Sequence, residues 1–266
     1  MNKNQIDSII QEINSEVSSY QLRKENLAKF TDTQSDQECL SYINGTGGWY
    51  CKFLALLVNK LPLKNIVELG NREGMSTLSI YDGMSKDAHF KTVDISKDQR
   101  YCPNEMFLDP RVSFIFGDVC DLNIYKDIPI DIDLLFSDTI HLDFQLRNEW
   151  SVYEPLLANS ALFAIDDINL NDKRKLFDEL PYAKWDLTKL CHGSGWGLVL
   201  YERTEILTKE ERIKKSLMAA LKIWKNNSDL KDVFIDNLPK NKLKKSLKSL
   251  LRKTPILHKL SIALRK

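Results

Sequence analysis

Five short apolar runs of strand length, each followed by acidic residues or by a glycine turn, constrain the fold of this chain more than any other feature. Their endings come in chain order at residues 67–74, 93–94, 117–118, 138–141 and 166–167. Parallel strands in an open α/β sheet bring their carboxyl ends to one edge, and ligands bind there. The order therefore predicts a single crevice lined by one glycine turn, several carboxylates and a histidine.

Strand and helix patterns alternate through the middle of the chain. Strand-like runs cover residues 65–69, 90–93, 112–116, 130–136 and 161–165, and helical spacing covers 5–30, 49–59, 76–84 and 144–157. Residues 183–190 and 196–201 predict two further strands, joined by a short glycine-containing turn. We therefore expect an α/β fold: a doubly wound, mostly parallel seven-stranded sheet with an antiparallel last strand, flanked by helical extensions at both ends.

The length of 266 residues fits one sizeable domain with extensions. We expect a helical N-terminal lid extension over residues 1–48 and the main domain over 49–203. A helical extension over 204–239 follows, beginning at the capping box of Thr208 and Glu211, and a basic amphipathic tail covers 240–266.

The tail separates the charges of the chain. Residues 240–266 contain ten Lys and Arg residues and no acidic residue, whereas residues 1–239 contain 28 basic and 37 acidic residues. A basic amphipathic helix suits an anionic membrane surface. The alternatives are a solvated helix and a contact between copies of the chain in a homo-oligomer. Nucleic acid is disfavoured as a partner because the body of the chain is acidic.

The cysteines and the N-terminus bear on the cellular location. The five cysteines are scattered and include no CxxC pair, which favours reduced thiols over a disulfide framework. The polar N-terminus has no signal-peptide core, and no run reaches the roughly 20 apolar residues of a membrane span. We expect a cytoplasmic protein, with the tail allowing a peripheral position on the inner face of the membrane.

The first strand ending carries a glycine turn before a helix. Gly70 and Gly74 permit a tight turn and a close approach of the backbone to a ligand. Ser76 and Thr77 lie at the N-terminus of the following helix, where the partial positive charge suits a carboxylate or phosphate. Arg72 stands where a dinucleotide fingerprint has its second glycine, so an ordinary strand-to-helix turn remains the alternative.

Two further carboxylates end the second and third strands. Asp94 could accept both hydroxyls of a ribose, and Asp118 could receive the exocyclic amine of an adenine. The alternatives are a solvated Asp94 and a turn-forming Asp118.

The fourth and fifth strands deliver Asp138, Asp166 and Asp167 to neighbouring positions. Three carboxylates would repel one another unless a cation lies between them, and Mg²⁺ or Mn²⁺ fits such oxygen ligands. His141 follows three residues after Asp138 and is a natural general base for a hydroxyl. A helix-capping Asp138 and a structural His141 are the alternatives.

His192, in the turn of the last two strands, could reach a ligand but has no acidic neighbours in sequence, and we do not assign it to the site.

This ordered set of motifs, spread over residues 49–203, resembles the class I S-adenosylmethionine-dependent methyltransferases, whose fold is Rossmann-like. It is most similar to the cation-dependent O-methyltransferases, and among these to the sugar branch of macrolide tailoring with its cephalosporin-biosynthesis relatives. The catechol-type branch has a lysine at the position of His141. Residues 158–160 (Ala-Asn-Ser) replace the usual Gly-Gly before the fifth strand, and Arg72 makes the first loop bulkier than the common pattern.

The resemblance implies roles for matching residues. S-adenosylmethionine would be bound by Glu68, Gly70, Asn71, Arg72, Gly74, Ser76, Thr77, Asp94, Asp118 and Asp138. Asp138, Asp166 and Asp167 would hold the metal ion, and His141, with Asp138, would form the catalytic pair. Residues that contact the acceptor are expected within 31–52, 143–147 and 168–175.

The expected function is therefore Mg²⁺-dependent methylation of a hydroxyl on a diol-bearing acceptor, for which we favour a sugar of a glycan, glycolipid or natural product. Two alternatives stay open. A metal-independent small-molecule methyltransferase would use Asp166 and Asp167 to bind substrate hydroxyls. A non-catalytic protein with the cofactor fold would act as a scaffold at the membrane surface.

Overall fold

A computed structural model of the chain describes residues 1–23, 41, 43, 45, 48–72, 74–96, 104–121 and 123–226. The chain divides into two units, Met1–Leu221 and Lys222–Lys266, and the sheet belongs to the first. The basic tail over 240–266, with its expected membrane or oligomer contact, lies outside the described residues, as do residues 24–40, 42, 44, 46 and 47 of the expected lid over 1–48. Among the described helices, none has the length and apolar content needed to cross a bilayer.

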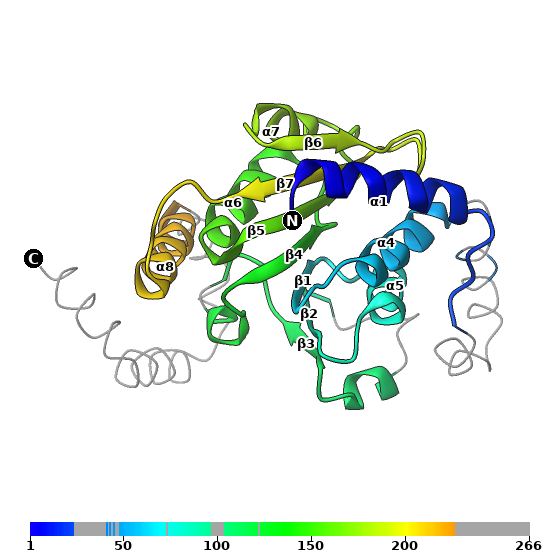
Figure 1. Ribbon diagram of the computed structural model, residues 1–266. Helices are drawn as coiled ribbons and strands as arrows, with labels where there is room; N and C mark the ends of the chain where they lie inside the picture. Colours follow the sequence, from blue (N-terminus) through cyan, green and yellow to red (C-terminus); the bar gives the residue numbers. More distant parts are fainter. Residues whose placement is uncertain are drawn as a thin grey trace, which may run out of the picture. The chain divides into compact units, whose positions relative to one another are not determined.

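The centre of the molecule is a seven-stranded sheet in the order β3-β2-β1-β4-β5-β7-β6 (Figure 1). The strands are β1 Asn65–Leu69, β2 His89–Asp94, β3 Val112–Phe116, β4 Ile132–Ser137, β5 Leu157–Asp166, β6 Ala183–Asp186 and β7 Trp196–Glu202. Neighbours among β1 to β5 pair in parallel, whereas β7 is antiparallel to both β5 and β6. This confirms the predicted fold class, and it places the topological switch point between β1 and β4.

Helices cover the sheet, and helices also precede the first strand and follow the last. They are α1 Lys3–Glu16, α4 Trp49–Lys60, α5 Met75–Gly83, α6 Asp143–Tyr153, α7 Arg174–Glu179 and α8 Lys209–Asn226, with 3₁₀ turns at Asn104–Leu108, Tyr125–Asp127 and Glu154–Leu156. The predicted capping box of α8 is present, because Thr208 Oγ1 accepts a bond from the Glu211 amide while the Glu211 carboxylate accepts from Thr208.

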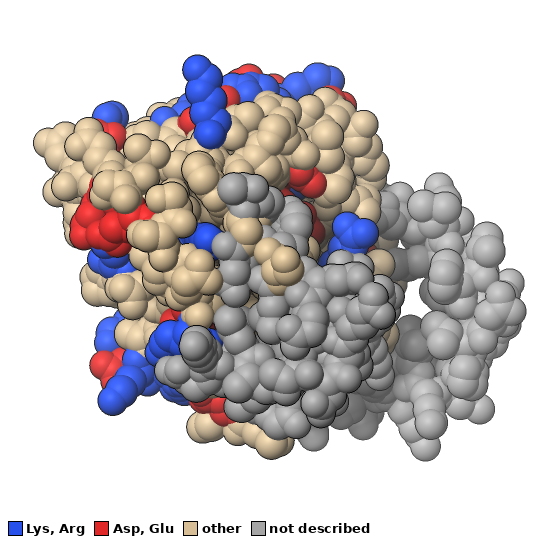
Figure 2. All heavy atoms as spheres, turned by 90° about the vertical axis from the view of Figure 1, so that its right-hand side faces the viewer, with Lys and Arg blue, Asp and Glu red and all other residues tan. Residues whose placement is uncertain are grey.

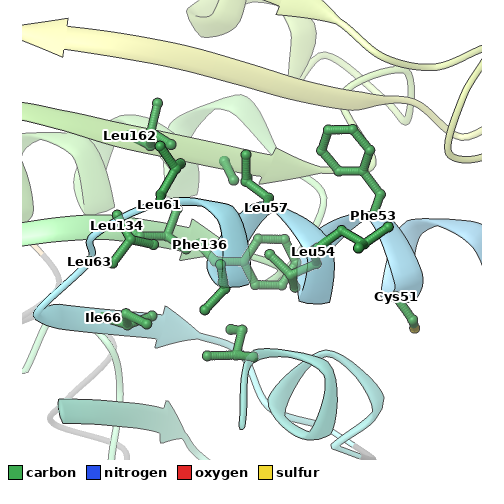
Figure 3. Close-up of a cluster of buried hydrophobic side chains, with 14 of the residues drawn as sticks. Cys51, Phe53, Leu54, Leu57, Leu61, Leu63, Ile66, Leu134, Phe136 and Leu162 are labelled. Carbon is green, nitrogen blue, oxygen red and sulfur yellow. The ribbon is translucent and has the colours of Figure 1, made fainter. Parts of the chain in front are cut away.

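Helix α4 is the hydrophobic centre of one face of the sheet. Its residues from Tyr50 to Val58 are all buried, because α1 covers it on the outside and the strands lie beneath it. Figure 3 shows Phe53, Leu54 and Leu57 directed toward side chains of the strands, such as Phe136. A helix buried on all sides is mostly apolar, and in α4 Lys52 is the one charged residue of the buried stretch.

The opposite face of β5 and β7 packs against α6. Trp150 stacks on Phe163 with ring centroids 5.1 Å apart and meets the edge of Tyr201 at 5.9 Å. Because successive strand residues point to opposite faces, Phe163 and Tyr201 belong to this layer, whereas Leu162 and Leu200 belong to the α4 layer. Residues 144–157 were predicted to form one helix, but α6 ends at Tyr153.

The early end of α6 has a local cause. Pro155 lacks an N–H and restricts the residue before it, so the chain passes through one 3₁₀ turn and enters β5 at Leu157 rather than at 161. At the other end of the sheet, β6 stops at Asp186 instead of 190, because the Asp186 carboxylate accepts from the Thr188 amide and starts a turn. The first difference lies at the amino end of β5, whereas β6 ends at the same edge of the sheet as the carboxyl end of β5.

The described surface mixes both signs of charge. On the face in Figure 2, Lys and Arg (blue) and Asp and Glu (red) are interspersed among uncharged residues. Some of these charges join elements: Lys60 Nζ lies 2.6 Å from Glu12 Oε1 and 3.0 Å from Glu16 Oε2, which ties α4 to α1. Such exposed pairs are each worth at most about 1 kcal/mol, so the fold depends mainly on its two apolar layers.

Candidate active site

The carboxyl ends of the parallel strands surround a cavity of about 710 Å³. The loops after β1, β2, β3, β4 and β5 all contribute to its lining, together with the β6–β7 turn and the start of α4. Of the residues expected to bind a donor or metal, these line it: Gly70, Asn71, Arg72, Gly74, Ser76, Asp94, Asp118, Asp138, His141, Asp166 and Asp167. The five strand endings of the sequence therefore meet in one cavity.

The turn after β1 requires glycine at two positions. Gly70 has φ of +87°, and a Cβ atom there would lie 2.1 Å from the carbonyl oxygen of Asp138. Gly74 has φ of +88° and caps α5 in the left-handed conformation. Arg72 also has a positive φ, 45°, which is uncommon for a residue with a side chain. Gly70 thus allows the end of β1 to lie against Asp138 after β4 directly beneath the cavity, and Gly74 allows the turn into α5.

Asp94, at the end of β2, is bonded to this turn. Its Oδ2 accepts hydrogen bonds from the amides of Asn71 at 2.8 Å and Arg72 at 2.7 Å, and its Oδ1 accepts from the Ser96 amide at 2.6 Å. An ionised carboxylate has about four acceptor sites, so about one remains for a hydroxyl donor from the cavity. Asp118, after β3, is exposed and accepts a bond from the Cys120 amide, as a turn-forming aspartate does.

Glu68 and Thr77 lie behind the cavity rather than among its lining residues. Glu68 is 0% exposed, and its carboxylate accepts from Ser76 Oγ and Thr77 Oγ1, each at 2.6 Å. Burial raises the pKa of Glu68 to about 7 although these hydroxyls favour its charged form. The placement differs from the direct donor contact expected for Glu68 and Thr77: they fix the start of α5, and Ser76 alone of the three reaches the cavity.

The other side of the cavity contains an imidazole between two carboxylates. His141 Nε2 lies 2.9 Å from Asp167 Oδ2 and 3.9 Å from Asp138 Oδ1. Asp138 and Asp167 together raise the pKa of His141, against the effects of burial and of the positive charge of Lys173. Asn171 Nδ2 donates to the His141 carbonyl at 2.8 Å and so supports the loop. The imidazole is therefore held at the cavity wall with carboxylates to orient it.

A second imidazole stands beside the remaining carboxylate. His192 Nε2 lies 2.8 Å from Asp166 Oδ1, and the ring meets the edge of Tyr50 with centroids 5.1 Å apart. Burial and the charge of Asp138 raise the pKa of Asp166 to about 6. Burial favours the neutral imidazole of His192, but the bond to Asp166 raises the pKa of His192 overall.

Sequence analysis did not assign His192 to the site, and the pairing of strands shows why it belongs there. β7 runs antiparallel to β5 with Trp196 opposite Asp166, so the turn that precedes Trp196 must lie beside the carboxyl end of β5. An antiparallel last strand was predicted, and that prediction was the available signal. Tyr50, Gln145 and Asn171 also line the cavity, one from each segment expected to contact an acceptor.

The possible metal ligands form two overlapping groups. One contains Asp138, His141 and Asp167, and the other contains Asp166, Asp167 and His192, with the ligand atoms of each group within 4.8 Å of one another. The three expected carboxylates are thus linked through Asp167, whose φ of 56° places it in the left-handed region. Carboxylate oxygens fit Mg²⁺ or Mn²⁺, and the imidazoles shift the donor set toward Mn²⁺.

Comparisons with known proteins agree with this geometry. Residues 67–168 match the family described as methyltransferase domain. The SAH-bound methyltransferase PaMTH1 of Podospora anserina is 16% identical, with a TM-score of 0.53 over 76% of this chain and 97% of that one. The O-methyltransferase TomG of Streptomyces achromogenes, in complex with SAM, is also 16% identical, with a TM-score of 0.51 over 72% of this chain and 96% of that one.

A search of curated proteins gave no match. At these identities the solved structures establish the fold, and the domain match covers the strands from β1 to β5 that build the cavity. Residues 67–168 are thus similar to a methyltransferase domain, and the chain shares the fold of these two methyltransferases.

Proposed function

We propose that the chain is an O-methyltransferase that uses a divalent cation to methylate a hydroxyl of a diol-bearing acceptor, and that the acceptor is a sugar of a glycan, glycolipid or natural product. One observation carries the proposal: the group of Asp138, His141 and Asp167 lies in the same cavity as the glycine turn. A base and carboxylate ligands thus border the space where a methyl donor would bind.

The donor would occupy the side formed by β1, β2 and β3. Gly70 allows the backbone to approach the methionine portion, and Asp94 accepts a ribose hydroxyl with the acceptor site that its three amide bonds leave. Asp118, exposed at the end of β3, is placed to receive the adenine amine. In this arrangement Glu68 and Thr77 act from behind, by fixing the start of α5.

The acceptor hydroxyl would lie next to His141. The His141 ring nitrogen that does not face Asp167 takes the hydroxyl proton, while Asp167, 2.9 Å from Nε2, orients the ring and stabilises the imidazolium that forms. A methyl group on sulfonium is already activated, so the remaining requirement is the alignment of oxygen, carbon and sulfur in line. A divalent cation held by Asp138, Asp166 and Asp167 would supply Lewis acidity that lowers the pKa of a chelated diol.

The test is methyl transfer to a panel of nucleotide-sugars, glycans and simple diols, measured with Mg²⁺, with Mn²⁺ and after chelation. The proposal expects transfer to a diol that chelation abolishes and added metal restores. Transfer that persists in chelator would favour the metal-independent enzyme. Binding of S-adenosylmethionine without transfer to any acceptor would favour the scaffold. The name of TomG as an O-methyltransferase supports oxygen as the acceptor atom.

We also propose, from sequence alone, that residues 240–266 bind an anionic membrane surface. The support is their ten basic residues without an acidic one, each worth on the order of 1 kcal/mol near such a surface. Co-sedimentation with vesicles of phosphatidylglycerol, with and without these residues, tests it. Equal pelleting of the two proteins contradicts a membrane contact by the tail.

A further inference from the structure

We propose that Glu149 of α6 is a positioning residue for Asp138. Glu149 is 0% exposed. Its Oε2 accepts from Ser137 Oγ at 2.7 Å, and its Oε1 accepts from Thr139 Oγ1 at 2.5 Å. Ser137 and Thr139 are the two residues on either side of Asp138, so one buried carboxylate holds both flanks of the residue that borders the donor and the metal ligands.

The main chain of Asp138 is fixed at the same place. Its amide donates to the Leu69 carbonyl at 2.8 Å, and its own carbonyl lies where a Cβ atom on Gly70 would be. These contacts fix the backbone position of Asp138. The rotation of this segment about the axis of β4 then depends on the flanking side chains of Ser137 and Thr139. Glu149 supplies that restraint from a helix, which holds an active-site residue more rigidly than a loop does.

Glu149 also reaches the cavity through Gln145. Gln145 Nε2 donates to Glu149 Oε1 at 2.9 Å from one turn earlier on α6, and Gln145 lines the cavity. The same carboxylate therefore orients Asp138 at the end of β4 and an amide opposite it. This makes the cavity wall between β4 and α6 a single hydrogen-bonded unit.

The unit is electrostatically demanding. Burial raises the pKa of Glu149, whereas its three donors and the charge of Lys173 favour the ionised form. Lys173 is itself 0% exposed, its Nζ has no hydrogen-bond partner among the described residues, and its charge is felt by both Glu149 and His141. Apolar side chains would fill such space without desolvating charges. The polar arrangement is therefore better explained by orientation than by stability.

The inference rests on the proposed function, because the orientation of Asp138 matters for turnover only if Asp138 serves the base His141 and the metal ion. Glu149→Gln keeps the size of the side chain and removes one acceptor oxygen. We expect kcat for methyl transfer to a diol probe to fall about ten- to a hundredfold, as for residues that support metal ligands, while KM for S-adenosylmethionine changes less than about threefold. A purely structural role would change both or neither.

Glu154→Gln is the matched control. Glu154 follows α6 directly and accepts from the Tyr201 hydroxyl at 2.5 Å, on the packing side of β7 and outside the cavity lining. This variant should keep kcat and KM. If Glu149→Gln does not fold, Thr139→Val alone carries the test, since it removes one of the two flanking bonds, with an expected threefold to tenfold loss of kcat.

A double-mutant cycle and a crystal structure complete the test. Glu149→Gln and Thr139→Val both weaken the hydrogen bonds that hold the flanks of Asp138, so their effects on kcat should be non-additive. In crystals of the Glu149→Gln protein with S-adenosylhomocysteine, the Asp138 carboxylate should be displaced or adopt two conformers. An unmoved Asp138 overturns the inference, whether or not the wild type methylates a probe. Failure of the wild type to methylate any probe would overturn the proposed function instead.

Discussion

The two sides of the cavity are built in different ways. The side where the proposed methyl donor would bind, which we call the donor side, uses the main chain: the amides of Asn71 and Arg72 bind Asp94, and a positive φ at Gly70 brings the backbone close to the cavity. The opposite side, which we call the acid–imidazole side, consists of Asp138, His141, Asp166, Asp167 and His192, and uses side-chain contacts.

The contrast teaches which part of a site is encoded locally. The bonds of the donor side join residues that lie within one βαβ unit, from Glu68 to Asp94. The acid–imidazole side joins segments as far apart as residues 138 and 192, and it exists only once β7 pairs with β5. The two sides meet where Gly70 lies against Asp138. Separate damage to each side is therefore the way to test whether they have separate roles.

The largest effect is expected from His141→Ala, on the acid–imidazole side. Loss of a general base typically lowers the rate about 10²- to 10⁴-fold, so we expect kcat to fall about a thousandfold. Binding of S-adenosylhomocysteine, measured by calorimetry, should stay within about threefold, because His141 lies on the other side from the donor contacts. Unchanged turnover would remove His141 from the mechanism.

The next effect concerns Glu68, which supports the donor side, and the dependence of the free energy of unfolding on pH. The pKa of Glu68 is raised to about 7 in the fold, above the usual 4.5. The unfolded chain therefore releases this proton at a lower pH than the folded chain does. Because of this, the free energy of unfolding falls by about 3 kcal/mol for this group as the pH rises from about 4.5 to about 7.

Glu68→Gln removes this titration. Urea unfolding at pH 5 and pH 7.5 should show a smaller loss of stability for the variant than for the wild type over that interval, by up to about 3 kcal/mol. All other groups titrate in both proteins, so the difference isolates Glu68. Parallel losses in the two proteins would mean that Glu68 is ionised in the fold throughout, and that its bonds from Ser76 and Thr77 outweigh its burial.

Asp166→Asn should separate the two sides through the metal. The change keeps the size of the side chain but removes a negative charge from the group of Asp166, Asp167 and His192. We expect the affinity for Mg²⁺ or Mn²⁺, titrated after chelation, to fall about ten- to a hundredfold, with donor binding unchanged. Asp178→Asn, at an exposed position of α7, is the control. Equal metal dependence in the wild type and the Asp166 variant would exclude Asp166 as a ligand.

The sequence was sufficient for the fold and for the placement of Gly70 and Asp94 at one edge of the sheet, because both follow local rules. Apolar runs of strand length alternate with helical spacing, and Gly70 and Asp94 stand at strand ends where a short motif identifies them. His192 was not assigned because no neighbour in sequence indicates Asp166; only the register of β5 against β7 does. Glu149 was not singled out for a related reason: its side chain is buried, and the polar sequence of α6 does not reveal this.

The smallest effect is expected from Asp94→Asn, which affects the donor side alone. The amide keeps one oxygen for the turn amides of Asn71 and Arg72, but it loses charge and half of its acceptor sites. Affinity for S-adenosylhomocysteine should fall about tenfold, which is the size of one hydrogen bond to a charged group. Metal affinity should not change, in contrast to the Asp166 variant, and Asp87→Asn, an exposed partner of Lys64, should leave both affinities intact. If Asp94→Asn weakened metal binding as much as donor binding, the two sides would act as one coupled unit through the contact between Gly70 and Asp138.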